Sequence, residues 1–181
     1  MDEQKTSFDY EDDFVSDQQR FEYTQMLEKA DNVVLGFVAT TGATGAIPIP
    51  FADAPLIVAQ QVTMMTAINV IFKFNIGKDA LKSLATATLG VGGATVVGRA
   101  IVANLIKLIP IKGSIIGGVI SASTAVIITL ALGKAYIQVC KLIKMGKLNQ
   151  DDLIKKAGID ALKAAFKEQL KENKNCSHSL L

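Results

Sequence analysis

Apolar and small residues dominate three long stretches of the chain, and each stretch lacks charged side chains. No charge occurs over residues 32–52, 54–72 or 113–133. Shorter polar segments separate the three stretches, and no alternating apolar and polar pattern of any length occurs between them. Because a half-buried strand alternates with a period of two residues, the pattern predicts an all-α protein.

The first predicted helix extends from about Ser16 to Thr40. Ser16 followed by Gln19 resembles a capping box at its start. Apolar residues then recur at three- and four-residue spacing, which is typical of a helix with one packed face. This apolar seam comprises Tyr23, Leu27, Ala30, Val34 and Phe37.

The segment "AIPIPFADAP", residues 46–55, interrupts the apolar pattern. Pro48 and Pro50 cannot lie inside a regular helix without losing hydrogen bonds and clashing, and each favours extended geometry in the residue before it. Asp53 stands where a helix N-cap is expected, and Pro55 suits the first turn that follows. We therefore expect a short extended link and then a new helix.

This second helix is predicted over Ala54–Phe72, with Gly77 suited to a C-cap after it. Its polar residues follow a three-residue spacing that drifts around the helix, so it has no clean water-facing side. These polar residues are Gln60, Thr63, Thr66 and Asn69.

Glycines crowd the next part of the chain. A third helix is predicted over Asp79–Ile109, with a turn at Pro110 and Gly113. Gly113–Gly133 is the best candidate for a transmembrane helix, because it is 21 residues long and uncharged. Glycines in helices are favourable mainly where backbones approach closely. The glycines assigned to such packing are Gly90, Gly92, Gly93, Gly98, Gly117 and Gly118.

The C-terminal part is basic and predicts an amphipathic helix over residues 148–173. Its apolar face is expected to include Ile154, Ala161, Leu162 and Ala165. Lysines here could contact anionic lipid headgroups, and a plain solvated face is equally compatible with them. No aromatic residues alternate with the lysines, so no nucleic-acid partner is expected. The lysines assigned to headgroup contact are Lys141, Lys144, Lys147, Lys156 and Lys163.

The expected organisation is two glycine-rich apolar helical hairpins with flanking amphipathic helices. Residues 1–15 are predicted to be a disordered acidic tail and 174–181 a disordered C-terminal tail. Residues 16–147 form the hairpin domain, and residues 148–173 the amphipathic helix. The first 31 residues carry 10 acidic and 3 basic groups and do not resemble a secretory signal, so both termini are expected in the cytosol.

Enzymatic chemistry has little support in the sequence. The glycines near residue 90 lack both dinucleotide-binding spacing and the lysine of a phosphate-binding loop, since Arg99 follows Gly98. With one histidine, His178, and no Cys–His pair, we expect no catalytic residues, no metal and no cofactor. Asp53 and Arg99 are isolated charges in apolar surroundings, which makes them functional candidates by default. A capping role for Asp53 is preferred.

Two motifs resemble a known family. The stretch "AIPIPFADAPLIVAQQVTMMTAI" and the later stretch "KLIPIKGSIIGGVISASTAVIITLALGKAYIQV" are similar to YcjF-like, GTPase-associated helical domains of unknown function, the DUF 697 type. The resemblance covers about residues 30–140. It implies membrane association and partnership with an Era-like GTPase, and it implies no known reaction. No GTPase domain precedes the motifs here, so the chain would either act with a separate GTPase in trans or stand alone.

The leading hypothesis is a non-enzymatic, membrane-associated helical protein that acts as an accessory or effector of a GTPase in a membrane process. Its hairpins, Asn32–Phe72 and Ser83–Gly133, would insert in or across a bilayer, with lysines biased to one side. The expected partners are membrane lipids, a separate GTPase and further copies of the chain. The alternatives are a soluble all-α interaction module for a GTPase and a pore-forming protein.

Overall fold

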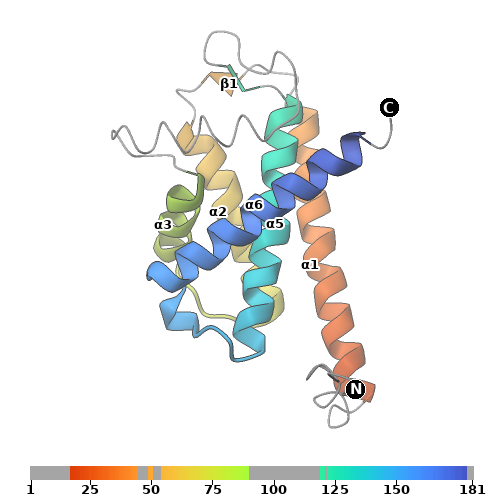
Figure 1. Ribbon diagram of the computed structural model, residues 1–181, viewed down its shortest axis with the longest axis vertical. Coiled ribbons are helices and arrows are strands. Elements are labelled where there is room, and N and C mark those ends of the chain that lie inside the picture. Colours follow the sequence, from red (N-terminus) through yellow and green to blue (C-terminus); the bar gives the residue numbers. More distant parts are fainter. Residues whose placement is uncertain (1–16, 45–48, 51–53, 90–118, 121, 179–181) are drawn as a thin grey trace, which may run out of the picture.

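The protein is an all-α helical bundle, as its sequence predicts (Figure 1). In this computed structural model, the described residues are 17–44, 49–50, 54–89, 119–120 and 122–178. The only strands among them are two of two residues each. The elements are α1 (Asp17–Thr44), β1 (Ile49–Pro50), α2 (Ala54–Phe72), α3 (Lys78–Leu89), β2 (Val119–Ile120), α5 (Ala122–Lys144), the 3-10 helix η3 (Gln150–Asp152) and α6 (Lys156–His178).

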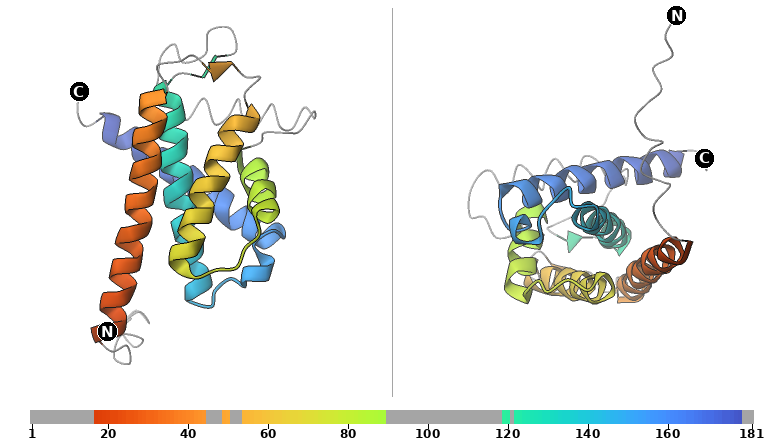
Figure 2. Two further views of the ribbon diagram at one scale, coloured as in Figure 1. Left: turned by 180° about the vertical axis from the view of Figure 1, so that it is seen from behind. Right: turned by 90° about the horizontal axis from the view of Figure 1, so that it is seen from below.

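Helix α5 lies at the centre of the bundle. Viewed along the helices, α1 and α2 form one side, α6 crosses the opposite side, and α5 lies between them (Figure 2). Helix α3 packs against α2 and α6. The buried face of α5 is correspondingly wide, and it includes Ala131, Leu132, Ala135, Tyr136, Ile137, Val139 and Cys140.

The predicted apolar seam of α1 is confirmed, and it packs mainly against α5. Ala30 and Val34 are fully buried. The other residues of the apolar seam, Tyr23, Leu27 and Phe37, are partly buried. At Gly133 the two helices come very close, since a Cβ added there would lie 2.6 Å from Val34 Cγ2. Next to this contact, the Lys134 ammonium forms a 2.8 Å ion pair with Asp31 on α1.

The predicted bounds of α2 are confirmed at both ends, but its predicted C-cap is wrong. Lys73, not Gly77, takes the left-handed conformation after the helix, with φ 58°. Phe74 N–H donates to Asn69 O at 2.9 Å, which closes the Schellman pattern of hydrogen bonds at this end. Gly77 instead precedes α3, where its carbonyl accepts a hydrogen bond from Leu81 N–H.

Helix α5 begins later and ends later than the predicted segment Gly113–Gly133. Val119 and Ile120 form β2, which pairs antiparallel with β1. Prolines favour extended geometry at β1, and the β-branched residues of β2 suit pairing with an extended partner. At the other end, Gly133 does not stop the helix, which runs on to Lys144 before Gly146 takes a φ of 68°.

The predicted extended link is confirmed at Ile49–Pro50, and Pro55 lies in the first turn of α2. The predicted third helix is confirmed over Lys78–Leu89, and its remainder lies outside the described residues. The other predicted features that lie outside them are Pro48, Asp53, Arg99, Pro110 and Gly113, together with the packing glycines Gly90, Gly92, Gly93, Gly98, Gly117 and Gly118.

The C-terminal amphipathic helix forms as α6, with different bounds from those predicted. It begins at Lys156, after η3, and extends to His178. Leu162 and Ala165 are buried as expected, together with Phe166 and Leu170. Ile154 was expected on the apolar face but is 50% exposed, because it precedes the helix.

The close approach of α1 to α5 gives a paired stability prediction. Gly133→Ala should lower the free energy of unfolding by about 1–3 kcal/mol, since the new methyl must displace branched Val34 atoms in a packed interior. Gly36→Ala is the matched control, because nothing lies within 4 Å of a Cβ at that helical position. It should raise stability by about 0.5–1 kcal/mol through helix propensity. Equilibrium urea unfolding measures both, and equal effects would contradict the close contact.

The two left-handed helix ends give a second pair of opposite effects. Lys73→Gly should stabilise the protein by about 1 kcal/mol, because glycine adopts positive φ without a Cβ penalty. Gly146→Lys should destabilise it by a similar amount for the same reason. Thermal unfolding midpoints compare the two variants with the wild type, and a lower midpoint for Lys73→Gly would refute the assigned backbone conformation.

Candidate functional site

Helices α2 and α5 form the apolar centre of the molecule and constitute the candidate site. In α5, the stretch Ala125–Lys144 is long and apolar enough to cross a membrane, with a mean hydropathy of 1.7. Half of this stretch is buried inside the bundle. It is the one such helix among the described residues, and α2 contributes a shorter apolar stretch, Val58–Phe72. Within the described residues, the structure therefore contains fewer membrane-length helices than the two predicted hairpins require.

A polar contact joins α2 to α5 near the middle of both helices. Gln61 Nε2 donates to Thr129 Oγ1 at 2.9 Å, and both side chains are buried. The two residues are 68 positions apart in sequence, so the bond ties together distant segments. It is an uncharged pair inside an otherwise apolar interface.

A second polar contact joins the same helices about two turns further along. Tyr136 Oη donates to Asn69 Oδ1 at 2.6 Å, again with both side chains buried. Cys140 lies one turn beyond Tyr136 and is also buried. Because both pairs advance in the same direction along the chain, α2 and α5 run parallel. We call these four residues, Gln61, Asn69, Thr129 and Tyr136, the polar seam.

Two atoms of the polar seam lack a hydrogen-bond partner. Gln61 Oε1 and Asn69 Nδ2 are both fully enclosed. An unpaired buried polar atom costs about 1–3 kcal/mol, so the seam is not explained by stability alone. Amide and hydroxyl pairs of this kind hold helices together in lipid as well as in water. The seam therefore holds α2 against α5 in either setting.

A third polar contact connects α2 to α1. Gln60 Nε2 donates to Thr41 Oγ1 at 2.6 Å, and Thr41 Oγ1 donates to the carbonyl of Phe37 one turn earlier. Thr63 and Thr66 also donate to carbonyls of their own helix. The polar residues of α2 thus turn from the α1 side to the α5 side along the helix, which confirms the predicted drift.

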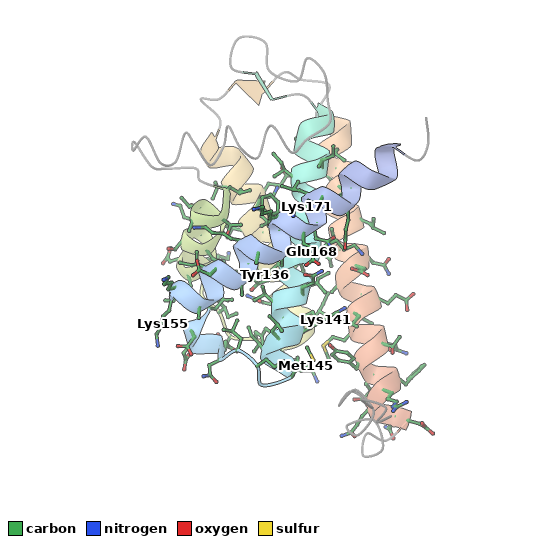
Figure 3. The ribbon with its side chains drawn as sticks, in the orientation of Figure 1. Tyr136, Lys141, Met145, Lys155, Glu168 and Lys171 are labelled. Carbon is green, nitrogen blue, oxygen red and sulfur yellow. The ribbon has the colours of Figure 1, made fainter. Side chains whose placement is uncertain are left out.

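The lysines assigned to headgroup contact fall into two places. Lys144, Lys147 and Lys156 are exposed where α5 ends and α6 begins, with the partly buried Lys141 beside them. Lys163 lies two turns further along α6 and is partly buried. In Figure 3, the labelled Met145 and Lys155 lie near one end of the bundle, and Lys171 lies far along α6.

One ion pair fixes the turn before α6. Lys155 Nζ contacts Asp152 Oδ1 at 2.8 Å, and Asn149 donates to the same carboxylate. The hydrogen bond from Lys155, then that from Asn149, lowers the pKa of Asp152. The same bond raises the pKa of Lys155. Both groups therefore stay charged over the physiological pH range.

Sequence reasoning named Asn69 of the polar seam but missed Thr129, Tyr136 and Gln61. Of the three, Gln61 left a signal in the sequence. It lies on the same helical face as Met64, Met65 and Ile68, all three of which are fully buried. A glutamine inside an apolar stripe at this spacing signals a buried polar contact. In the described part of the chain, no three His, Cys, Asp or Glu side chains gather closely enough to hold a metal ion.

Comparison with known proteins gives one family and one relative. The model of a family described as a domain of unknown function, DUF697, matches residues 13–175. The chain is 26% identical over 149 residues to "Magnetosome membrane protein 22" of Magnetospirillum gryphiswaldense, covering 80% of this chain and 70% of that protein. No solved structure matches the chain.

The polar seam predicts strong coupling between Asn69 and Tyr136. Tyr136→Phe should cost about 1–3 kcal/mol of unfolding free energy, because it leaves the Asn69 amide buried without its partner. Adding Asn69→Leu to Tyr136→Phe should recover most of that loss, since the pair is then apolar on both sides. A double-mutant cycle by urea unfolding measures the coupling. Strictly additive effects of the two substitutions would show that the contact is not formed.

Proposed function

The chain belongs to the DUF697 family, as its proline and glycine motifs predict, and on this premise we propose that it is a membrane-associated helical protein with no enzymatic activity of its own. The relative that it resembles is described as a membrane protein. The description of the family names no activity. The description of the relative fits a helical protein that works at a membrane.

The observation that carries this proposal is the pairing of α2 with α5. α2 has no charged residue along its length, and the charged residues of α5 are Lys134, Lys141 and Lys144. The polar seam joins them through uncharged groups, a type of contact that survives transfer into lipid.

A second candidate function, a soluble all-α interaction module, is favoured by a different observation. α1 and α6 cover much of α5, and the outer face of α6 is charged. A charged helix packed across α5 cannot enter the hydrocarbon core at low cost. Full insertion of α5 would therefore require α6 to leave it, whereas attachment at the membrane surface leaves the bundle intact.

The family resemblance further supports a role beside a GTPase. We propose that the protein serves as an accessory of an Era-like GTPase that acts in trans. We also propose that copies of the chain associate with one another through helix faces that are lined by small residues. Proximity labelling in intact cells tests the first point: enrichment of a GTPase that depends on its nucleotide state supports it, and labelling of membrane proteins without any GTPase contradicts it.

Cell fractionation tests the proposed membrane association. The full-length chain should sediment with membranes at physiological salt, because its apolar helices and its lysines favour that environment. Sodium carbonate extraction of the pellet then separates two forms of attachment: retention indicates a crossing by α5, and release indicates surface attachment of the intact bundle. Recovery of the chain in the soluble fraction before carbonate treatment would refute membrane association and favour the soluble module.

A further inference from the structure

Two connections meet at one end of the bundle. One joins α2 to α3, and the other joins α5 to α6. Lys144 Nζ lies 5.4 Å from the centroid of the Phe74 ring, and Gln150 Nε2 donates to Asn75 O at 3.2 Å. Phe74 also stacks on Phe72, with centroids 5.7 Å apart. These contacts hold the two connections together as one surface, which we call the basic end.

The basic end carries a clear excess of positive charge. Within residues 70–79 and 141–156 there are seven lysines and three aspartates. Six of the lysines are exposed, and Lys141 is partly buried. The lysines are Lys73, Lys78, Lys141, Lys144, Lys147, Lys155 and Lys156, and the aspartates are Asp79, Asp151 and Asp152.

Helix termini explain only part of this excess. Lys141 and Lys144 lie in the last turn of α5, where a cation is favoured by the helix dipole. Lys73 directly follows the C-terminal end of α2, where the dipole still favours a cation. Lys147 lies beyond the last turn of α5, however, and Lys156 lies at the start of α6, where the dipole disfavours a cation. The charge at this end therefore exceeds what capping requires.

Within the described residues, the surroundings do not cancel the excess. The N-terminal half of α1, at the same end of the molecule (Figure 1), carries Asp17, Glu22 and Glu28 against Arg20 and Lys29. That adds one negative charge, since Asp31 is already paired with Lys134. The middle of α6 is balanced, with Lys163, Lys167 and Lys171 against Asp160, Glu168 and Glu172. The basic end remains the positive region of the described surface.

Exposed apolar side chains accompany the lysines. Val70 is 73% exposed, Met145 53% and Ile154 50%. In Figure 3, Met145 and Lys155 both lie at this end of the molecule. Lysines beside exposed aliphatic groups suit a lipid surface, where the ammonium groups meet phosphates and the aliphatic groups enter the interface. The aromatic side chains that would stack on bases are absent from the exposed residues here, since Phe72 is buried and Phe74 is partly covered by Lys144.

We propose that the basic end is a docking site for an anionic membrane surface, with Lys73, Lys147 and Lys156 among its headgroup contacts. This inference rests on the proposed membrane association and adds the lipid class and the face that binds. It places α2 and α5 with their C-terminal ends toward the headgroups. It also assigns headgroup contact to Lys147 and Lys156 rather than to Lys163.

Vesicle co-sedimentation of the full-length chain tests this proposal. The probes are vesicles of neutral phosphatidylcholine and vesicles that also contain anionic phosphatidylglycerol. The wild type should bind the anionic vesicles more tightly, and added salt should weaken the binding. The triple variant Lys73→Gln, Lys147→Gln, Lys156→Gln should bind them about 100-fold more weakly, from about fivefold for each lysine near the surface.

A matched control removes the same charge elsewhere. The triple variant Lys163→Gln, Lys167→Gln, Lys171→Gln should bind anionic vesicles within a few-fold of the wild type. Circular dichroism and thermal unfolding verify that both variants remain folded. Equal losses in the two variants, or no loss in the first, would overturn the assignment of the basic end.

The remaining outcomes separate this proposal from membrane association itself. Equal, salt-insensitive binding to neutral and anionic vesicles would overturn the basic end as a docking site and leave membrane association standing. Binding to neither kind of vesicle would overturn both. Binding to duplex DNA as tight as that to anionic vesicles, lost in the same Lys73, Lys147, Lys156 variant, would reassign the basic end to nucleic acid.

Discussion

The need to cover α5 determines how the rest of the bundle is arranged. α5 is a 23-residue helix with buried side chains on most of its circumference, so no single partner helix can shield it. α1 covers one face through the Val34 and Gly133 contact, α2 covers another through the polar seam, and α6 crosses a third. The composition of each of these helices fits its position in the bundle. α1 is apolar along one stripe, α2 lacks charge throughout, and α6 is charged on its outer face alone.

In this arrangement the charged residues are separated along the length of the bundle as well as around its circumference. α2 contains no charged residue, and Lys73 directly follows its last residue. In α5, Lys141 and Lys144 lie in the last turn. Because α2 and α5 run parallel, these lysines arrive at the same end of the molecule. In this helix pair the mid-helix Lys134 is ion-paired with Asp31, and the other cations are collected at one end. Such an arrangement fits a membrane interface, where hydrocarbon and headgroups lie a short distance apart. The proposed function follows from that juxtaposition.

Much of this fold could be predicted from the sequence, because local signals are strong where prolines and periodic apolar residues occur. Pro50, Asp53 and Pro55 placed the start of α2 correctly, and the three- and four-residue spacing identified the buried face of α1. One failure is local, and the others concern long-range contacts. Gly77 resembled a helix cap, but Lys73 is held in that role by hydrogen bonds to the end of α2. Val119 and Ile120 fall within a predicted helix but form β2, because β1, which lies 70 positions earlier in the chain, pairs with them. The pairing of Gln61 with Thr129 likewise could not be read from either segment alone.

Hydrogen–deuterium exchange of the full-length chain, with and without anionic vesicles, tests the central claim most directly. The central claim is that an intact bundle with a covered α5 meets the membrane through its basic end. It predicts slow exchange along α5 in both states, and new protection on vesicle binding confined to residues 70–79 and 141–156. Fast exchange of α5 in the absence of vesicles, or new protection along α1 and the middle of α2 with none at the basic end, would contradict it.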